Sequence, residues 1–302
     1  MSDHITSKDT RSFAQSFITP PSAQVNTLAP GLYLVSTPIG NLRDITLRAL
    51  DVLSTADFIL AEDTRTSGKL MQAYDLKTPL SAYHDHNAAK RVPNLIERIK
   101  NGAVIALISD AGTPLVSDPG FKLARACADE GLPVIAIPGA SAVLAGLVSS
   151  GMASDKFMFA GFLPPKTAAR KTQLEALASV PASLIFFESA GRLNAAVADM
   201  LAILGDRPAA IARELTKKYE EIIRGNLSEL TAQLDGTKLR GEIVVIIGPP
   251  PKQQAWDEAQ ITDLLRIRIP EIGVKRASEE IAQLSGEKKR NIYTLALKLK
   301  NG

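Results

Sequence analysis

The sequence predicts an α/β protein with two α/β domains and a small helical module after them. Three observations lead to this fold class. Short apolar runs alternate with helical patterns from Gly31 onward, Gly-rich and Pro-rich breaks divide the chain, and no strand pattern follows the last break. We expect a disordered tail over residues 1–29, domains over 30–151 and 152–249, and a helical module over 252–302.

The first domain has the alternation of strands and helices that builds a mostly parallel sheet. Its apolar runs cover residues 32–35, 58–61, 104–108 and 133–137. Its helical patterns cover residues 46–56, 66–74, 88–101, 119–130 and 141–150. Asp118 and Pro119 have the residue types of a helix N-cap and first helical position, so we expect a helix to begin there.

The second domain is expected to contain a mixed sheet. Its apolar runs cover residues 157–162, 184–187, 209–212, 221–224 and 242–247, and its helical patterns cover about 167–178, 193–204 and 227–235. The runs at 209 and 221 are too close for a crossover helix, which predicts a hairpin.

The helical module follows the stiff segment Gly248–Pro251. Helical periodicity covers residues 257–267, 274–284 and 287–299, a pattern that resembles a small helix-turn-helix bundle. The net charge of the chain is +3, and the positive excess lies in this module.

Composition excludes several classes of protein. Hydrophobic residues make up 45% and charged residues 22%, a balance typical of soluble domains. The apolar runs are too short to span a bilayer. A single cysteine, Cys127, excludes an intrachain disulfide and fits a reducing cytoplasm. Three histidines are too few and too poorly spaced for a typical zinc site, so we expect no metal.

Three unusual loops follow strands of the first domain, over residues 36–41, 110–114 and 138–141. Parallel sheets bind ligands at this end of their strands, and glycines allow a ligand to approach the backbone closely. The chain has neither a dinucleotide fingerprint nor a P-loop. A ligand with hydroxyls and a cationic centre, such as S-adenosylmethionine, suits Asp110 better than a polyphosphate does. We expect Asp110 to anchor this site through a hydroxyl, a backbone N–H or the field it exerts on a sulfonium.

Eight motifs then occur in order, at residues 36–46 (STPIGNLRDIT), 61–67 (AEDTRTS), 109–120 (SDAGTPLVSDPG), 138–142 (PGASA), 159–166 (FAGFLPPK), 186–192 (FFESAGR), 213–221 (RELTKKYEE) and 241–248 (GEIVVIIG). With them the chain resembles the class III S-adenosylmethionine methyltransferases of the tetrapyrrole-methylase superfamily. It is most similar to the branch that methylates the 2′-oxygen of a cytidine in 16S rRNA, by resemblance cytidine 1402 in rRNA numbering.

Two features depart from the patterns of that superfamily. Ala88 stands where the H-x-x-N-E pattern has an acid, which puts an acidic role at that position in doubt. The first loop, Thr37–Asn41, lacks the G-x-G-P-G-D pattern of tetrapyrrole relatives, which favours RNA as the substrate.

The resemblance implies a cofactor cleft between the two domains, S-adenosylmethionine as methyl donor, a homodimer, and 16S rRNA or the small ribosomal subunit as partner, with no membrane association. The cofactor-binding residues expected from the loops and motifs are Pro38, Gly40, Asp110, Ala111, Gly112, Thr113, Pro114, Ala140, Ser141, Phe162, Leu163, Glu214, Leu215, Gly241 and Glu242.

Methyl transfer to a ribose hydroxyl is helped by a base or by a positive charge near the developing alkoxide. The candidate catalytic residues are Glu62, Asp63, Arg65, Glu188, Arg213 and Lys217. Asp63 is also a plausible helix N-cap, and Lys217 can act as a base only if burial lowers its pKa. The candidate RNA-binding residues are His86, Asn87, Lys166, Arg170, Lys288, Lys289 and Arg290. Solvated helix faces and an ordinary loop histidine are the competing interpretations.

Two other functions remain open from the sequence. A small-molecule methyltransferase of the tetrapyrrole type is disfavoured by the first loop and by the basic helical module. A non-catalytic nucleic-acid-binding protein on a methylase fold is disfavoured by the intact Asp110 and the intact run from Gly112 to Pro114.

Overall fold

The computed structural model describes residues 28–237, 239–251 and 256–301. The chain forms two compact units, residues 1–249 and residues 250–302. The expected tail falls on residues 1–27, which lie outside the described residues, and Leu28 packs partly against the first core. None of the helices in the described ranges is long and apolar enough to cross a membrane.

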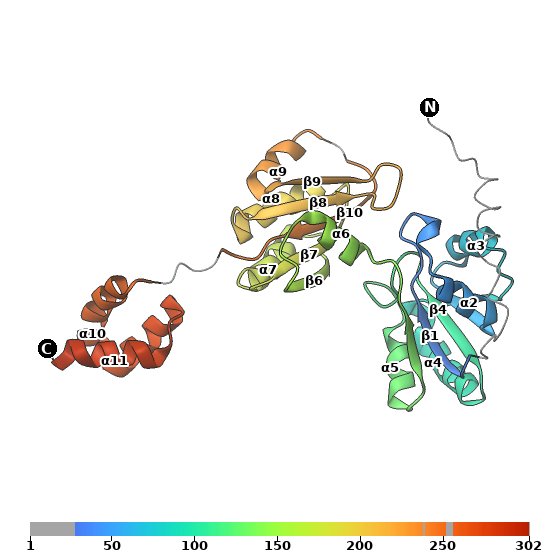
Figure 1. The fold of residues 1–302 in the computed structure, drawn as a ribbon, viewed down its shortest axis with the longest axis horizontal. Coiled ribbons are helices and arrows are strands. Elements are labelled where there is room, and N and C mark those ends of the chain that lie inside the picture. The colour runs from blue at the N-terminus through green and yellow to red at the C-terminus, as the bar shows by residue number, and fades with distance from the viewer. Residues whose placement is uncertain (1–27, 238, 252–255, 302) are drawn as a thin grey trace. The chain divides into compact units, whose positions relative to one another are not determined.

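The first sheet is five-stranded and wholly parallel, in the order β3-β2-β4-β1-β5 (Figure 1). Its strands are β1 (Gly31–Val35), β2 (Phe58–Ala61), β3 (Leu80–Ala82), β4 (Val104–Ile108) and β5 (Val134–Ile137). Short β3 was not expected from the sequence. It pairs with β2 from Ile59 opposite Leu80 to Ala61 opposite Ala82, and this pairing defines it.

Helices cover both faces of this sheet, as its buried strands require. On one face α2 (Leu47–Thr55) and α3 (Thr64–Ala73) share a hydrophobic core with alternate strand residues. On the other face lie α4 (Asp85–Lys100) and α5 (Phe121–Asp129), whose core includes Cys127. A short 3-10 helix, η1 (Leu42–Asp44), follows the first loop.

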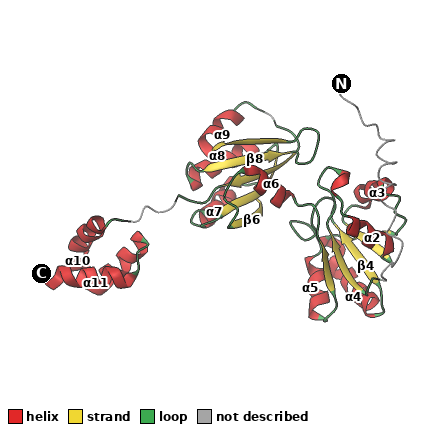
Figure 2. Ribbon diagram, viewed as in Figure 1, coloured by secondary structure: helices red, strands yellow, loops and turns green. Residues whose placement is uncertain are grey.

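The second sheet is mixed, in the order β6-β7-β10-β8-β9 (Figure 1), and helices lie beside its strands (Figure 2). Its strands are β6 (Phe157–Phe162), β7 (Ser183–Ser189), β8 (Pro208–Arg213), β9 (Glu221–Asn226) and β10 (Glu242–Ile247). Strands β8 and β9 pair antiparallel from Arg213 opposite Glu221 to Pro208 opposite Asn226, which confirms the expected hairpin.

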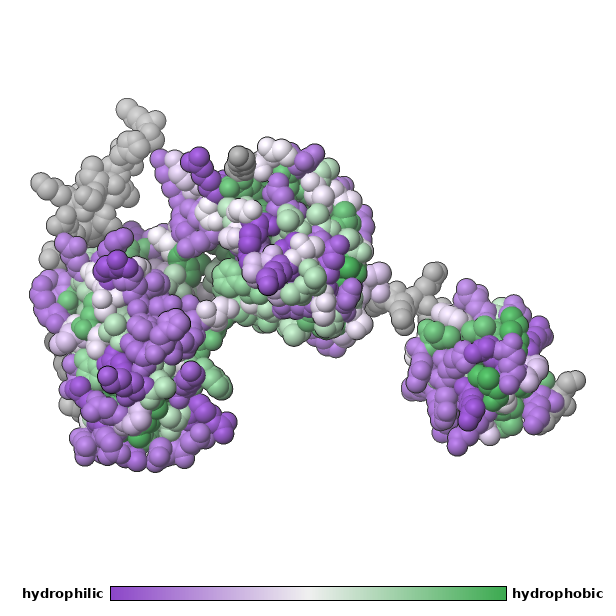
Figure 3. Space-filling model, turned by 180° about the vertical axis from the view of Figure 1, so that it is seen from behind, coloured by the Kyte–Doolittle hydropathy of each residue, from purple (hydrophilic) through white to green (hydrophobic). Residues whose placement is uncertain are grey.

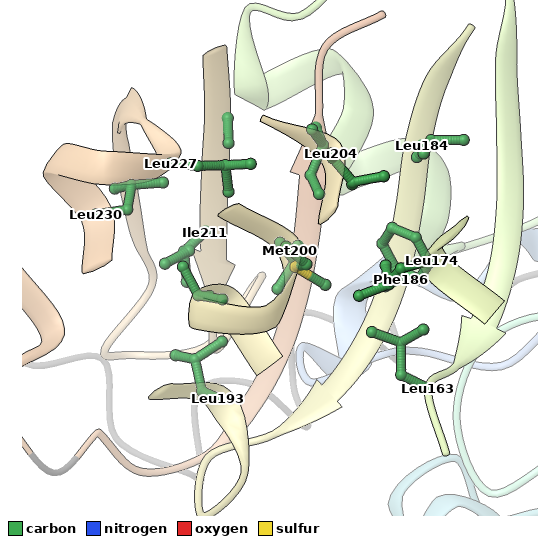
Figure 4. Packing of buried hydrophobic residues seen from close by; sticks show 14 of the residues in the cluster. Leu163, Leu174, Leu184, Phe186, Leu193, Met200, Leu204, Ile211, Leu227 and Leu230 are labelled. Atoms are coloured by element: carbon green, nitrogen blue, oxygen red, sulfur yellow. The ribbon is translucent and has the colours of Figure 1, made fainter. Parts of the chain in front are cut away.

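One face of the second sheet packs on α7 (Thr167–Leu177), α8 (Leu193–Leu204) and α9 (Leu227–Leu234). Figure 4 shows Met200 of α8 between Phe186 of β7 and Ile211 of β8, which closes this core. The other face packs on α6 (Ala142–Ser150), whose Val143 and Leu147 share a core with strand residues of the second sheet and with Ile39 from the first loop. Helix α6 follows β5 directly, so it joins the two halves of this unit.

The second unit contains α10 (Glu258–Ser285) and α11 (Lys289–Asn301). Gly273 interrupts α10 with φ 79° and ψ 160°, so two helical segments meet there, as the break in the sequence pattern predicted. These segments and α11 enclose a small core of Leu265, Ala277, Ile281, Ile292 and Ala296.

Candidate active site

A pocket of about 340 Å³ lies where loops of the two sheets of the first unit meet. The first half of the unit contributes Ile39, the loop after β4, and the start of α6. The second half contributes Phe162, the end of β7, Leu215 and the start of β10. Its volume falls in the range typical of small-molecule sites.

Hydrogen bonds join the three loops that the sequence singled out. Thr37 and Gly112 exchange backbone hydrogen bonds of 2.9 and 3.0 Å. The Ser36 hydroxyl donates to Thr113 Oγ1 over 3.1 Å, and the Thr113 hydroxyl donates to the Ala140 carbonyl over 3.2 Å. The loops after β1, β4 and β5 therefore form one connected wall, consistent with ligand binding at this edge of a parallel sheet.

Asp110 accepts a hydrogen bond of 3.2 Å from the backbone N–H of Asp63. Of the partners expected for Asp110 from the sequence, namely a hydroxyl, a backbone N–H or a sulfonium, the structure shows a backbone N–H. This bond ties the loop after β4 to the loop after β2. Asp110 itself does not line the pocket.

Asp63 begins α3 as its N-cap, because its side chain accepts from the backbone N–H of Arg65 over 2.9 Å. Hydrogen bonds from the Arg65 side chain and backbone hold the pKa of Asp63 low, at about 2. Arg65 is largely exposed, and its guanidinium returns to Asp63 over 2.7 Å. The competing interpretation of Asp63 as a helix cap is therefore confirmed.

Glu62, the neighbouring residue, carries a perturbed carboxyl group. Burial raises the pKa of Glu62, and the charge of Asp110 raises it further. Among the described residues, no Lys or Arg forms a salt bridge with Glu62, Asp110 or Asp118. At this edge of the first sheet Asp63 is paired with Arg65, whereas Glu62, Asp110 and Asp118 have no salt bridge of their own within the described part of the chain.

The expectation that Asp118 caps a helix is wrong. Helix α5 begins at Phe121, and its N-cap is Gly120, with φ 132°. Ser117 has φ 66°, so the chain reverses before the helix, and Asp118 becomes a lining residue of the pocket. Sequence reasoning missed this site residue because the Asp-Pro pair so often marks a helix start.

On the second sheet, Lys217 lies between two carboxylates. Its ammonium donates to Glu214 Oε1 over 2.8 Å and to Glu242 Oε2 over 2.9 Å. Burial alone would lower the pKa of Lys217, but these hydrogen bonds outweigh it and the pKa is raised. The raised pKa does not favour Lys217 as a base, and its two hydrogen bonds hold Glu214 and Glu242 together.

The other two candidate catalytic residues of this half are also paired. Glu188 is buried, and its Oε1 accepts from the Ser189 backbone N–H and from both Nε and Nη2 of Arg192, at 2.8, 2.8 and 2.5 Å. Arg213 forms an ion pair of 3.0 Å with Glu221 across the β8–β9 hairpin. Both arrangements fix the ends of strands.

Of the residues expected to bind cofactor, those that line the pocket are Ala111, Gly112, Thr113, Ser141, Phe162, Leu215, Gly241 and Glu242. The others are not among the lining residues, namely Pro38, Gly40, Asp110, Pro114, Ala140, Leu163 and Glu214. Leu163 is 2% exposed and belongs to the core under α7 and α8, so it is corrected to a packing residue.

The structure adds lining residues that the sequence did not single out, among them Val116, Val143, Phe187 and Ser189. The apolar lining residues come from the strand ends and α6, where core residues and pocket residues follow the same apolar pattern. The sequence pattern therefore does not distinguish a pocket residue from a core residue at these positions.

The candidate RNA-binding residues divide into two groups. Arg170 is 4% exposed and pairs with Asp199 of α8 over 2.6 Å, so the interpretation as an RNA contact is corrected to a structural ion pair. Asn87 accepts from the His84 backbone N–H and holds the start of α4. His86 and Lys166 are exposed, as are Lys288, Lys289 and Arg290 of the second unit.

The pocket fits a ligand with a cationic centre. No Lys, Arg or His is among its lining residues, whereas Asp118, Glu188 and Glu242 are. Side chains such as Val116, Phe162 and Phe187 provide apolar walls. Gly112 and Gly241 line the pocket with φ values of 79° and 97°, a backbone conformation that glycine adopts readily. Within the described ranges no group of three or more His, Cys, Asp or Glu is placed to hold a metal ion.

Comparison with known proteins supports this chemistry. Residues 31–231 match the model of the tetrapyrrole (corrin/porphyrin) methylases, and the chain belongs to that family. Cobalt precorrin-4 methyltransferase CbiF has the same fold, with a TM-score of 0.55 and 18% identity, covering 72% of this chain and 94% of that one. Uroporphyrin-III C-methyltransferase from Thermus thermophilus, solved with S-adenosylhomocysteine, has a TM-score of 0.50 and 21% identity, covering 72% and 97%.

The sequences of curated relatives identify the group within the methylase family to which the chain belongs. Ribosomal RNA small subunit methyltransferase I of Mesorhizobium japonicum is 49% identical over 278 residues, which cover 91% of this chain and 94% of the relative. The protein of the same name from Haemophilus influenzae is 45% identical, covering 88% and 96%. Within the methylase family, the chain therefore belongs to the ribosomal RNA small subunit methyltransferase I group.

Proposed function

We propose that this protein methylates the 2′-oxygen of a cytidine in 16S rRNA, by resemblance cytidine 1402, with S-adenosylmethionine as methyl donor. The observation that carries the proposal is the pocket, whose lining includes carboxylates and apolar walls and no cationic side chain. Such a lining suits a sulfonium and an adenosine better than it suits a phosphate group. The bound donor supplies a methyl group on a positively charged sulfur, and we expect it to bind without a metal.

The residues of this chain have distinct parts in the proposal. The connected loops with Thr37, Gly112 and Thr113 position the donor, and Phe162 and Phe187 exclude water from it. Ion pairs of Lys217 fix the loop that carries Leu215 beside the pocket. The proposed substrate also implies a cytoplasmic protein.

A direct test compares small-subunit rRNA from a deletion strain and its parent by mass spectrometry of nuclease fragments. One ribose methyl group should be absent from the deletion strain and should return when the purified protein is added to its small subunits with the donor. Methylation of a base instead of a ribose would contradict the 2′-oxygen as target. No methyl transfer to rRNA, together with transfer to a corrin or porphyrin, would support the small-molecule alternative.

The second unit supports RNA binding. Lys275, Lys289, Arg290 and Tyr293 line a hollow of about 380 Å³ on its surface. Tyr293 is 39% exposed, so its ring can stack on an unpaired base while Lys275 and Arg290 contact phosphates. Lys289 is paired with Glu279 over 2.5 Å. Figure 3 shows hydrophobic and hydrophilic surface mixed on this unit.

Reversing the charges of Lys288, Lys289 and Arg290 together should weaken RNA binding about tenfold or more at low salt and flatten its salt dependence. Charge reversal at Lys298, an exposed residue of α11 outside the hollow, is the matched control. Normal RNA affinity in the triple variant would remove these residues from the interface.

We also propose that two copies of the chain associate, as the resemblance implies. Leu144 and Val148 of α6 are 51% and 76% exposed, and Phe157 and Met158 of edge strand β6 are 43% and 41% exposed. Exposed apolar side chains of this kind favour burial against a partner. Val148→Asp should halve the mass measured by light scattering, whereas Leu284→Asp in the second unit should not change it.

A further inference from the structure

The inference concerns Asp118, which the geometry releases from any capping role. Gly120 is the N-cap of α5, and Asp118 lies among the residues that line the pocket, on its first-sheet side. Its side chain is partly buried and lies near Ser109, whose hydroxyl donates to the Ala111 and Gly112 carbonyls. A carboxyl group placed in a cavity, without a helix end to stabilise it, is a candidate for chemistry.

The backbone around Asp118 is held in an uncommon conformation. Leu115 and Ser117 have φ values of 72° and 66°, in the left-handed region that branched and bulky residues rarely adopt. At Gly120, with φ 132°, a Cβ atom would lie 2.7 Å from side-chain atoms of Leu107 and Leu115, so only glycine fits. Strain of this kind persists where the surrounding structure fixes a functional group.

The charges that face Asp118 are all negative or neutralised. Glu62 follows β2 and Asp110 follows β4, and both repel a second negative charge. From the second sheet, Glu188 and Glu242 line the same pocket, but Arg192 and Lys217 pair with them. Burial raises the pKa of Asp118 to about 6, helped by Glu62 and Asp110 and opposed by the nearby Ser109 hydroxyl.

We propose that Asp118 is the general base that accepts the proton of the ribose hydroxyl. The proposal rests on the proposed function. In the reaction the 2′-oxygen forms a bond to the methyl carbon while the carbon–sulfur bond breaks and its electron pair stays on sulfur. The hydroxyl proton passes to an Asp118 carboxylate oxygen and then to solvent. A carboxylate whose pKa lies near the working pH accepts a proton more effectively than an ordinary one.

The first test is Asp118→Asn, which keeps the shape of the side chain and removes the base. We expect kcat on small subunits, measured at saturating S-adenosylmethionine, to fall at least about 100-fold, and the Kd for the donor in calorimetry to rise by a smaller factor because one lining carboxylate is lost. Asp129→Asn, at an exposed ion pair on α5, is the matched control and should leave kcat unchanged. A wild-type kcat in Asp118→Asn, or loss of donor binding instead of kcat, would overturn the assignment.

The second test follows the carboxyl group directly. In the donor-free protein, ¹³C-NMR of labelled aspartate should show one carboxyl that titrates near pH 6 and disappears in Asp118→Asn. The kcat/KM of the wild type for S-adenosylmethionine, which reports the donor-free protein, should rise through the same pH region, and Glu62→Gln should move that rise to lower pH because a repelling charge is removed.

The outcomes separate this inference from the proposed function. If wild type and Asp118→Asn methylate rRNA at the same rate, Asp118 is not the general base, and the proposed function still stands. A wild type that methylates no ribose overturns the proposed function, and the base falls with it, whatever the NMR titration shows.

Discussion

The two sides of the pocket treat their carboxyl groups in opposite ways. On the second-sheet side each acid has a cation, because Arg192 pairs with Glu188 and Lys217 pairs with both Glu214 and Glu242. On the first-sheet side Glu62 and Asp118 have raised pKa values, and burial is the main cause for both. Paired charges fix geometry, whereas an unpaired buried carboxyl can exchange a proton near neutral pH. The comparison indicates that the second-sheet side is the rigid side of the pocket and that the first-sheet side is its reactive side.

The largest expected effect tests whether the charges of the second half are structural. Arg170→Ala should lower the free energy of unfolding by about 3 kcal/mol, because it leaves Asp199 buried without its main partner. Lys171, whose ammonium lies 3.5 Å from Asp199, supplies only partial compensation. Chemical denaturation measures the change.

The double variant Arg170→Met with Asp199→Leu is the matched control and should recover most of the lost stability. RNA affinity of folded Arg170→Ala should equal that of wild type. A stable variant with weakened RNA binding would instead restore the interpretation of Arg170 as an RNA contact.

Arg170 also shows what the sequence could predict. Apolar periodicity located nearly every strand and helix, because those elements bury one face or both. It missed β3, whose three residues are defined by pairing with β2. It placed Arg170 at the surface, because the run Lys166 to Lys171 looks like a solvated helix face, while the partner lies 29 residues away on another helix.

In the site, too, some features could be predicted from the sequence and others depend on the folded structure. The three strand-end loops were predictable because glycines and a carboxylate at those positions have a chemical reason. Asp118 was not, since its role depends on the left-handed conformation of Ser117, a residue type that gives no signal for it. Lys217 was named, but one of the two carboxylates that hold it is Glu242, which approaches from another strand.

A smaller effect is expected from Lys217→Met on the rigid side. Two carboxylates, Glu214 and Glu242, would lose their shared cation, and stability at neutral pH should fall by about 1 to 2 kcal/mol. The hydrogen bond from Lys217, and then that from the Glu242 backbone N–H, lowers the pKa of Glu214, so its stabilising contribution is present above the ordinary value of 4.5. The loss should therefore shrink as pH falls below that value.

Lys218→Met, at an exposed neighbour, is the control and should change the midpoint of thermal unfolding little. An equal effect of the two substitutions would mean that the Lys217 ion pairs contribute no more than surface charges do.

The last prediction concerns stability on the reactive side and has the opposite sign. The folded-state pKa of Asp118, about 6, lies above the ordinary value of 3.8, so its contribution to stability is greatest below pH 3.8 and is lost as pH rises through 6. Asp118→Asn removes this penalty and should stabilise the protein by about 1 to 2 kcal/mol at about pH 7.5, a shift discounted for partial exposure. Denaturation near pH 4 should show almost no difference between variant and wild type. A variant that is less stable at both pH values would mean that the Asp118 carboxylate holds the loop together, and the contrast between the two sides of the pocket would then fail.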